Sequence, residues 1–389
     1  MTPSRPARTR SVAVVGGGIA GLATALALGR DGWSVTVHER APGLTALGAG
    51  LVLGPNAVRA LDALGLRAAV RERAFALTGS AVLRPDGRAL SRLAASRLAE
   101  RHGAPVLAVE RSALHALLAD AVGPGVVRCG SDIADATSLA GDHDLVVAAD
   151  GIRSRTRATA WPDAAAPSYA GYTAWRAVVH TDTGLTEASE TWGHRERFGV
   201  VPVGDDAVYV FATATVPAGR HAHDGATELA ELRRRFGAWH APLPALLDAV
   251  DPTTVLRHDV DALPRVPASF HRGRTVLVGD AAHAMEPNLG QGAGLALEDA
   301  VVLAHVLADG GRVEDALARF TALRRPRASS LVALSARLGR LTQGGGRATG
   351  AARDAVVRLT PAGLALRGSD RVMGWRPPRG AAAEARVGA

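Results

Sequence analysis

The stretch that most constrains the fold is Ser11–Arg40, where a strand pattern, a glycine turn, a helix pattern and a second strand follow one another. Gly16 allows a tight turn, Gly18 leaves room for a phosphate, and Gly21 lets the helix pack on the strand. Free N–H groups at the helix start attract anions, and Glu39 stands where an acid would bind a ribose hydroxyl. Because consecutive glycines interrupt the apolar run, the stretch predicts a dinucleotide site rather than a signal peptide.

The length of 389 residues predicts two lobes. The chain has a formal net charge of +8, and its basic residues are all arginine, so mechanisms that need a lysine are excluded. The arginines are scattered without interleaved aromatics, which argues against nucleic-acid binding. A single cysteine, Cys129, suits a reducing cytoplasm and is expected to be buried at a strand end. No apolar run is long enough for stable membrane insertion, and we assign no metal site.

Further along the chain, the hydrophobic pattern changes character several times. Residues 79–110 read as strands around a Pro-Asp-Gly turn, and a helix is expected to open at Arg111. Residues 171–215 alternate and carry several aromatics, which indicates an antiparallel sheet; helices are expected over 225–250. Residues 313–342 read as a long helix kinked at Pro326, followed by weak helix over 351–366 and a flexible tail.

In two more segments, adjacent aspartate and glycine residues directly follow a strand that is predicted to be buried. The first is Asp150-Gly151-x-x-Ser154-x-x-Arg157, which by turn statistics alone is more often a simple turn than a site. The second begins Gly279-Asp280-Ala281-Ala282-His283 and continues through a glycine-rich loop into a helix near Gly294. Asp280 is placed to accept a bond from a sugar hydroxyl, the helix amides to bind an electron-rich ligand edge, and His283 is expected to be structural.

In this order and spacing, the three segments resemble the fingerprints of the FAD-dependent group A aromatic-ring monooxygenases, which share the para-hydroxybenzoate hydroxylase fold. The resemblance implies an α/β chain in which a Rossmann-like FAD-binding domain carries an inserted, mainly antiparallel substrate sheet and a C-terminal helical segment. The expected limits are 1–75, 101–165 and 270–342 for the FAD-binding domain, 76–100 and 166–269 for the substrate-binding domain, and 343–389 for the C-terminal helix and tail.

The resemblance also assigns the cofactor contacts. The glycine turn would hold the FAD pyrophosphate, Glu39 the adenosine ribose, and Asp280 the ribityl chain. Arg40 and Ile133 would lie near the adenine, Arg111 near the ribityl–phosphate region, and the Pro287 loop along the isoalloxazine. Asp150 would contact both FAD and NAD(P)H. The full predicted set is Gly16, Gly18, Ile19, Ala20, Gly21, Glu39, Arg40, Arg111, Ile133, Asp150, Asp280, Pro287, Gly290, Gln291, Gly292, Ala293 and Gly294.

The middle sheet is most similar to that of the urate and salicylate hydroxylases. By this resemblance Arg197 and Tyr209 face the substrate; Arg197 would hold an anionic substrate, and Tyr209 or His194 would orient it or relay its proton. The implied reaction uses NAD(P)H and O₂ to hydroxylate an aromatic or polycyclic small molecule through a C4a-hydroperoxyflavin, in a monomer or homodimer. The alternatives are a flavin epoxidase, an antibiotic-inactivating hydroxylase on the same fold, and a flavin-binding protein without turnover.

Overall fold

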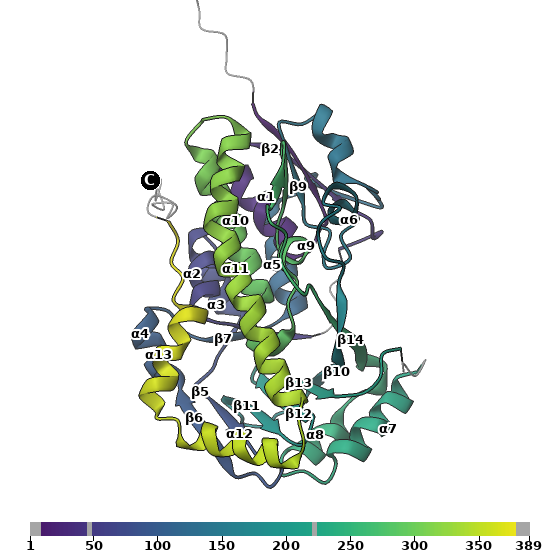
Figure 1. The fold of residues 1–389 in the computed structure, drawn as a ribbon, viewed down its shortest axis with the longest axis vertical. Helices are drawn as coiled ribbons and strands as arrows, with labels where there is room; N and C mark the ends of the chain where they lie inside the picture. The colour runs from purple at the N-terminus through teal and green to yellow at the C-terminus, as the bar shows by residue number, and fades with distance from the viewer. Residues whose placement is uncertain (1–8, 45–48, 220–223, 379–389) are drawn as a thin grey trace, which may run out of the picture.

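The computed structural model describes residues 9–44, 49–219 and 224–378 (Figure 1). A mainly parallel sheet organises the upper half of Figure 1, and its strand order is β15-β16-β9-β1-β2-β8. Its strands are β1 (Ser11–Val15), β2 (Ser34–Glu39), β8 (Val127–Cys129), β9 (Leu145–Ala148), β15 (His271–Arg272) and β16 (Thr275–Leu277). The central strands β1 and β9 are almost wholly apolar because both of their faces are buried.

Helices α1 (Ile19–Arg30), α5 (Arg111–Val122) and α10 (Gly292–Ala308) pack side by side beside this sheet. Their alanine- and glycine-rich surfaces allow close approach. α10 also contacts α2 (Pro55–Ala63), which α3 (Arg67–Arg73) follows. A small antiparallel sheet lies next to these helices, and its strands are β3 (Gly50–Leu53), β4 (Phe75–Ala76) and β7 (Leu107–Glu110).

A second large sheet has the order β14-β10-β13-β12-β11-β5-β6 and is antiparallel except where β11 meets β5. Its strands are β5 (Gly79–Leu83), β6 (Ala89–Ala94), β10 (Ser168–His180), β11 (Glu187–Trp192), β12 (Glu196–Pro202), β13 (Ala207–Ala214) and β14 (Leu256–Ala262). Alternate residues such as Trp175 and Val210 pack under α7 (Gly225–Phe236) and α8 (Leu243–Ala249). The opposite face carries Tyr172, Arg197 and Tyr209, and around Tyr209 it packs against the small antiparallel sheet, α4 (Ala95–His102) and α13 (Ala362–Met373).

The predicted fold class is confirmed: an α/β unit with a glycine turn, an inserted and mainly antiparallel sheet, and a helical C-terminus. The domain limits themselves stay a prediction. The long helix α11 (Val313–Gln343) runs through Pro326. The weak helix expected over 351–366 is instead two helices, α12 (Arg347–Leu359) and α13 (Ala362–Met373), because Pro361 begins a new helix where it cannot continue the old one. Of the tail expected to be flexible, residues 379–389 lie outside the described residues.

Two local predictions are wrong. Residues 95–102, expected in a strand region, form helix α4 (Ala95–His102), whose buried side includes Leu98 and which ends at Gly103 in a left-handed conformation. Cys129 is at a strand end as predicted, but β8 is the edge strand of its sheet and the cysteine is exposed. Between β8 and β9 lies a short 3₁₀ helix, η1 (Ala136–Gly141).

Within the described ranges, no helix combines the length and the apolar character needed to cross a membrane.

Candidate active site

Three segments that are distant in the sequence meet at one edge of the first sheet. They follow β1, β9 and β16, which are parallel neighbours, so their carboxyl ends lie together. This edge is where open α/β sheets bind ligands. The glycine turn after β1 therefore lies beside Asp150 after β9 and Asp280 after β16.

Close backbone contacts join the three segments. A β-carbon on Gly16 would lie 2.3 Å from the carbonyl oxygen of Ala149, and one on Gly279 would lie 2.6 Å from the β-carbon of Ala20. The buried guanidinium of Arg157 completes the set by donating to the carbonyl oxygen of Ala281 at 2.8 Å. Arg157 therefore connects the second segment to the third. Its role here is structural, which the sequence motif alone did not indicate.

The glycines of the first turn have different surroundings. A β-carbon on Gly21 would lie 1.9 Å from the carbonyl oxygen of Gly16, so Gly21 is needed for packing of α1. Around Gly18, by contrast, no atom of the described residues beyond its own chain neighbours lies within 4 Å of the β-carbon position. Gly18 is the N-cap of α1, and no described side chain caps that helix start. The first amides of α1 thus face open space, which is the geometry of an anion site.

Glu39 lies at the end of β2, next to this turn. Its carboxylate accepts hydrogen bonds from the amides of Gly17 at 2.7 Å and Ala41 at 2.8 Å. The chain passes close by again after β8, where the amide of Ser131 donates to the carbonyl oxygen of Glu39. Half-buried Ile133 follows Ser131 by two residues. Ile133 and Glu39 therefore lie near the same end of the carboxyl edge of the first sheet. Arg40 is exposed there.

Only one of the two carboxylate oxygens of Asp150 has a hydrogen-bond partner among the described residues. Its Oδ2 atom accepts from the amide of Thr156 at 3.1 Å near the start of α6 (Arg155–Ala160), whereas its Oδ1 atom is buried with no hydrogen-bond partner among the described residues. An unpartnered buried carboxylate oxygen costs free energy unless a ligand or water supplies the donor. Asp150 therefore fits a residue that completes its bonding with a bound molecule.

The third segment forms a turn, α9 (Asp280–His283), a 3₁₀ helix, η3 (Pro287–Leu289), and then α10. Asp280 is exposed, and its Oδ1 atom lies 4.0 Å from the β-carbon position of Gly292. Among the described residues no side chain caps α10, and the amides of Gly292, Ala293 and Gly294 have no partner within the helix because they form its first turn. α10 begins at Gly292, two residues before the expected start near Gly294.

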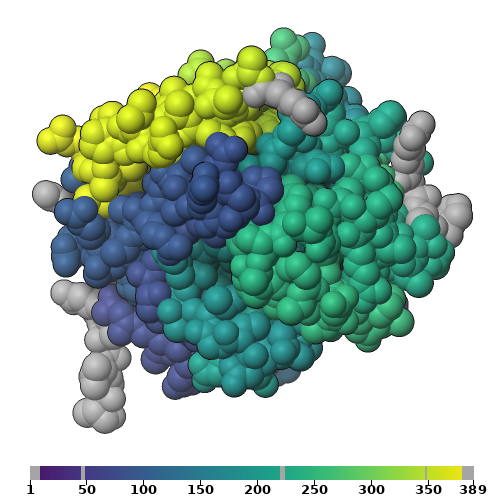
Figure 2. Space-filling model, turned by 90° about the horizontal axis from the view of Figure 1, so that it is seen from below, coloured from purple at the N-terminus to yellow at the C-terminus, as the bar shows by residue number. Residues whose placement is uncertain are grey.

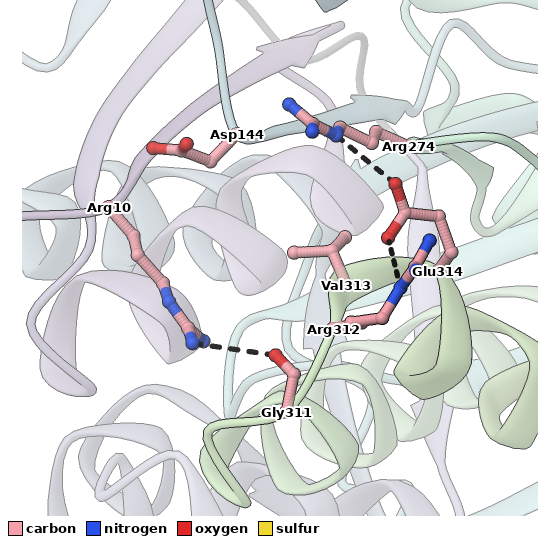
Figure 3. Close-up of a pocket in the computed structure, with 7 residues that line it drawn as sticks. All are labelled: Arg10, Asp144, Arg274, Gly311, Arg312, Val313 and Glu314. Atoms are coloured by element: carbon pink, nitrogen blue, oxygen red, sulfur yellow. Dashed lines mark hydrogen bonds and ion pairs between the residues drawn. The ribbon is translucent and has the colours of Figure 1, made fainter.

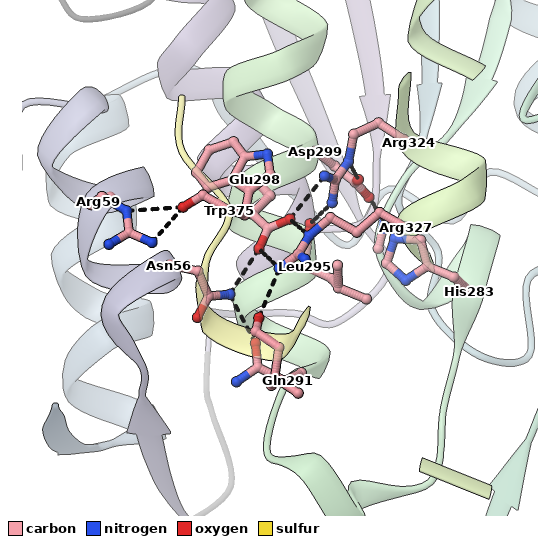
Figure 4. A network of polar contacts seen from close by, with 12 residues as sticks. Asn56, Arg59, His283, Gln291, Leu295, Glu298, Asp299, Arg324, Arg327 and Trp375 are labelled. Carbon is pink, nitrogen blue, oxygen red and sulfur yellow. Dashed lines mark hydrogen bonds and ion pairs between the residues drawn. The ribbon is translucent and has the colours of Figure 1, made fainter. Parts of the chain in front are cut away.

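A buried polar network fixes the start of α10 (Figure 4). Asn56, at the start of α2, donates to Gln291 Oε1 at 2.8 Å and to Glu298 Oε1 at 2.7 Å. Glu298 is fully buried and accepts from Arg324 at 2.8 Å and Arg327 at 2.6 Å. The glycine loop is thus held from α2 on one side and α11 on the other.

The same network reaches the turn at the end of β16. Asp299 accepts from His283 Nε2 at 2.6 Å, from Arg324 Nε at 2.7 Å and from the amide of Gly279 at 2.9 Å. Burial alone would raise the pKa of Asp299, but His283, Arg324 and the Gly279 amide together lower it to about 2. The carboxylate stays charged, and His283 is structural as expected.

The second sheet brings Arg197 to this loop. Arg197 is buried and donates from Nη2 to Asn288 Oδ1 at 2.5 Å, from Nη1 to Glu190 Oε1 at 3.0 Å and from Nε to Thr213 Oγ1 at 3.2 Å. Asn288 belongs to η3, directly beside Pro287. The positive charge of Arg197 is therefore already balanced by the carboxylate of Glu190, and its position is fixed against the loop.

Tyr172 makes a parallel connection from β10. Its hydroxyl contacts Glu286 Oε2 at 3.0 Å and Asn288 Oδ1 at 3.1 Å. Burial raises the pKa of Tyr172, and the neighbouring carboxylate of Glu286 raises it further, so the phenol remains protonated. The Glu286–Asn288 loop is consequently bonded to two strands of the second sheet.

Tyr209 is in β13, between the strands of Tyr172 and Arg197, and it packs against β3. Its Cβ atom would lie only 2.4 Å from a β-carbon on Gly50, so Gly50 lets the tyrosine ring approach β3. Burial raises the pKa of Tyr209, with Arg176 and Arg111 acting in the opposite direction. Tyr209 is therefore a protonated phenol with Arg111, exposed at the start of α5, close by.

His194 is not brought to this cluster. It lies exposed on the turn between β11 and β12, past the end of the strand from which Arg197 points inward. A role of His194 in relaying a substrate proton stays a prediction. The sequence reasoning also missed Asn56, Glu190 and Asn288; Asn288 stands between the predicted Pro287 and Gly290, and that position was the available signal.

An open hollow among the described residues lies away from this edge. It measures about 480 Å³ and is lined by Arg10, Asp144 and Arg274, which precede β1, β9 and β16, and by residues 311–314 (Figure 3). It is thus at the amino ends of the same strands. Its charged groups are largely bonded to one another, as in the contact of Arg274 with Glu314 at 3.2 Å, and we do not assign it to the active site.

The residues at the carboxyl edge fit FAD. Two helix starts without a side-chain cap, open space at Gly18 and Gly290, and the Asp150 oxygen without a partner match a phosphate-bearing ligand that extends from Glu39 to α10, as far as the described residues show. The individual contacts stay predictions.

Comparisons with known proteins agree with this geometry. Residues 9–335 match the family model described as an FAD binding domain. The chain is 39% identical to aurachin C monooxygenase/isomerase from Stigmatella aurantiaca, over 86% of this chain and 90% of that protein. It is 34% identical to 2-heptyl-3-hydroxy-4(1H)-quinolone synthase from Pseudomonas aeruginosa, over 90% and 94%.

Among solved structures, Klebsiella pneumoniae HpxO complexed with FAD and uric acid superposes with a TM-score of 0.82 at 28% identity, covering 92% of this chain and 95% of that one. Together with the glycine turn, the Asp150 segment and the loop before α10, these matches show that the chain belongs to the FAD-binding family of aromatic-ring monooxygenases with the para-hydroxybenzoate hydroxylase fold.

Proposed function

We propose that this chain uses FAD, NAD(P)H and O₂ to hydroxylate a neutral bicyclic heteroaromatic compound of the 4-quinolone class, in the cytoplasm. The observation that carries the proposal is the ion pair of Arg197 with Glu190 at 3.0 Å. It lies on the face of the second sheet that contacts the loop before α10. A carboxylate substrate would have to displace Glu190, whereas a neutral ring carbonyl needs only a free N–H. The names of the aurachin C and 4(1H)-quinolone relatives support the same class.

Bound FAD would supply the redox chemistry, with NAD(P)H as the reductant, one oxygen atom of O₂ entering the substrate and the other leaving as water. The residues of this chain contribute the arrangement around it. Arg197, which bonds to Asn288 of the loop, and Tyr209, a protonated phenol on the same face of the sheet, would orient the ring. Apolar residues behind Tyr209, among them Leu77 and Val201, exclude water and favour an alkyl-substituted ring.

The direct test uses the purified protein. It should be yellow, release FAD on denaturation, and oxidise NAD(P)H faster with a 2-alkyl-4-quinolone than with urate or salicylate. The product should carry one additional oxygen atom, detected by mass spectrometry. A yellow protein that oxidises no NAD(P)H with any member of the panel would indicate a flavin-binding protein without turnover.

Arg197→Ala tests the site itself. We expect FAD to stay bound while hydroxylation per NAD(P)H oxidised falls about tenfold or more, because the ring is no longer oriented. Arg195→Ala is the matched control, since Arg195 is exposed on the adjoining turn. Unchanged coupling and substrate affinity in Arg197→Ala would reject the proposed role of this residue.

A further inference from the structure

The C-terminal helices expose an unusual share of the apolar surface. Of the five large hydrophobic side chains that are exposed in the described part of the chain, four lie between residues 341 and 364. On α12 and α13 they are Val356, Leu359 and Leu364, exposed by 66%, 74% and 59%. In the view from below, the two helices form one ridge along the surface (Figure 2). Single exposed hydrophobic side chains are ordinary on a protein surface, whereas three on two consecutive helices mark a candidate interaction surface.

The exposed side chains form a stripe. Ala352, Val356 and Leu359 are spaced four and three residues apart, which places them on one side of α12. Arg353 and Asp354 occupy the other side and are buried. α13 adds one exposed large hydrophobic side chain, Leu364, while Val372 on its other side is buried. The outer surface of α12 is therefore mainly apolar, and that of α13 is mixed.

Arginine surrounds the stripe. Residues 337–376 contain eight arginines and two aspartates, a net charge of +6 within a chain of +8. Both aspartates are occupied: Asp354 pairs with Arg353 at 2.7 Å, and Asp370 accepts from Arg101 at 2.6 Å. Arg367 follows Leu364 by three residues and so lies on the same side of α13, while Arg358 is exposed on α12 next to Leu359 in the sequence. With Arg371 also exposed, the charges of these two helices that are left outside the two pairs are cationic.

We propose that this C-terminal patch, formed by Val356, Leu359, Leu364, Arg358 and Arg367, docks on the surface of an anionic phospholipid bilayer. Aliphatic side chains flanked by arginines suit the boundary between lipid head groups and acyl chains, where the helices would lie flat rather than span. A second copy of this chain is a poorer occupant, because a symmetric contact would bring the same arginines face to face.

Docking would place the bilayer next to the active site. The inner face of α13 carries Leu366 and Met373, which pack in the apolar cluster that contains Tyr209. One helix thus connects the lipid-facing surface with the wall of the site. An apolar substrate dissolved in the bilayer would then have a short route to the enzyme.

The test is co-flotation of the full-length holoenzyme with vesicles. We expect binding to vesicles of phosphatidylcholine mixed with phosphatidylglycerol, little binding to pure phosphatidylcholine, and weaker binding at high salt. Arg358→Gln and Arg367→Gln should each lower vesicle affinity about fivefold. The triple variant Val356→Ser, Leu359→Ser, Leu364→Ser should lower it by about tenfold or more. All of these side chains are exposed, so FAD content should not change.

Leu323→Ser and Arg312→Gln are the matched controls. Leu323 is exposed in the first half of α11, and Arg312 is exposed directly before that helix, so neither belongs to the C-terminal patch. They should bind vesicles like the wild type. Equal binding to neutral and anionic vesicles, or patch variants that bind like the controls, would overturn the proposal. So would a dimer in analytical ultracentrifugation that the triple variant abolishes, since that result assigns the patch to self-association.

Discussion

Gly18 and Gly21 belong to the same turn, but an added methyl group would meet different surroundings at each. At Gly18 it would enter the open space in front of α1, and at Gly21 it would collide with the carbonyl oxygen of Gly16. The first glycine thus serves the ligand and the second serves the fold. A motif alone does not separate these roles.

We therefore expect Gly18→Ala to weaken FAD binding about tenfold or more while leaving the melting temperature of the apoprotein nearly unchanged. Gly21→Ala should instead destabilise the apoprotein by about 1–3 kcal/mol, because overpacking forces the backbone to shift. Titration with FAD and thermal unfolding of the cofactor-free protein measure the two effects. An apoprotein that loses equal stability in both variants would contradict this division.

At the scale of elements, the sequence predicted those helices and strands that a local hydrophobic pattern or a turn motif specifies. The strand–turn–helix at Gly16, the helix after Arg111 and the buried strands before Asp150 and Asp280 all lie where the periodicity indicated. The short helix α4 was missed because eight residues give little periodicity. Long-range pairing was also out of reach: Asn288 meets Arg197 across 91 positions, and no spacing rule connects them.

α10 depends on a buried charge, which gives its stability a pH dependence. The pKa of Asp299 is about 2 in the fold and 3.8 ordinarily. Its contribution is therefore present above about pH 4 and is lost as the pH falls toward 2. The difference corresponds to roughly 2 kcal/mol.

Asp299→Asn should remove this part of the acid sensitivity and cost about 3–5 kcal/mol at neutral pH, because Arg324 loses one of its buried partners. Urea unfolding between pH 2 and pH 7 measures both effects. Asp309→Asn is the control: this acid follows α10 but is 59% exposed, and its removal should cost less than about 1 kcal/mol. Equal losses in the two variants would show that the buried network does not hold α10.

At the scale of the whole molecule, the loop before α10, residues 286–291, joins the two large sheets. Its residues Glu286 and Asn288 bond to Tyr172 and Arg197 of the second sheet, and Asn288 also donates to the carbonyl oxygen of Ser335 in α11 at 2.9 Å. A ligand that binds the loop and the glycine turn therefore stabilises an arrangement in which both sheets take part. FAD should act on the stability of the whole chain rather than on the first sheet alone.

FAD at about 100 times its Kd should stabilise the folded protein by about 2.7 kcal/mol. FAD release, followed by flavin fluorescence, and unfolding, followed by tryptophan fluorescence to which Trp175 and Trp192 contribute, should share one transition that rises with FAD concentration. In Asn288→Ala the two transitions should separate, because the loop loses its bond to Arg197 while the glycine turn still binds FAD. Two separate transitions in the wild type, with only flavin release responding to FAD, would mean that the sheets unfold independently.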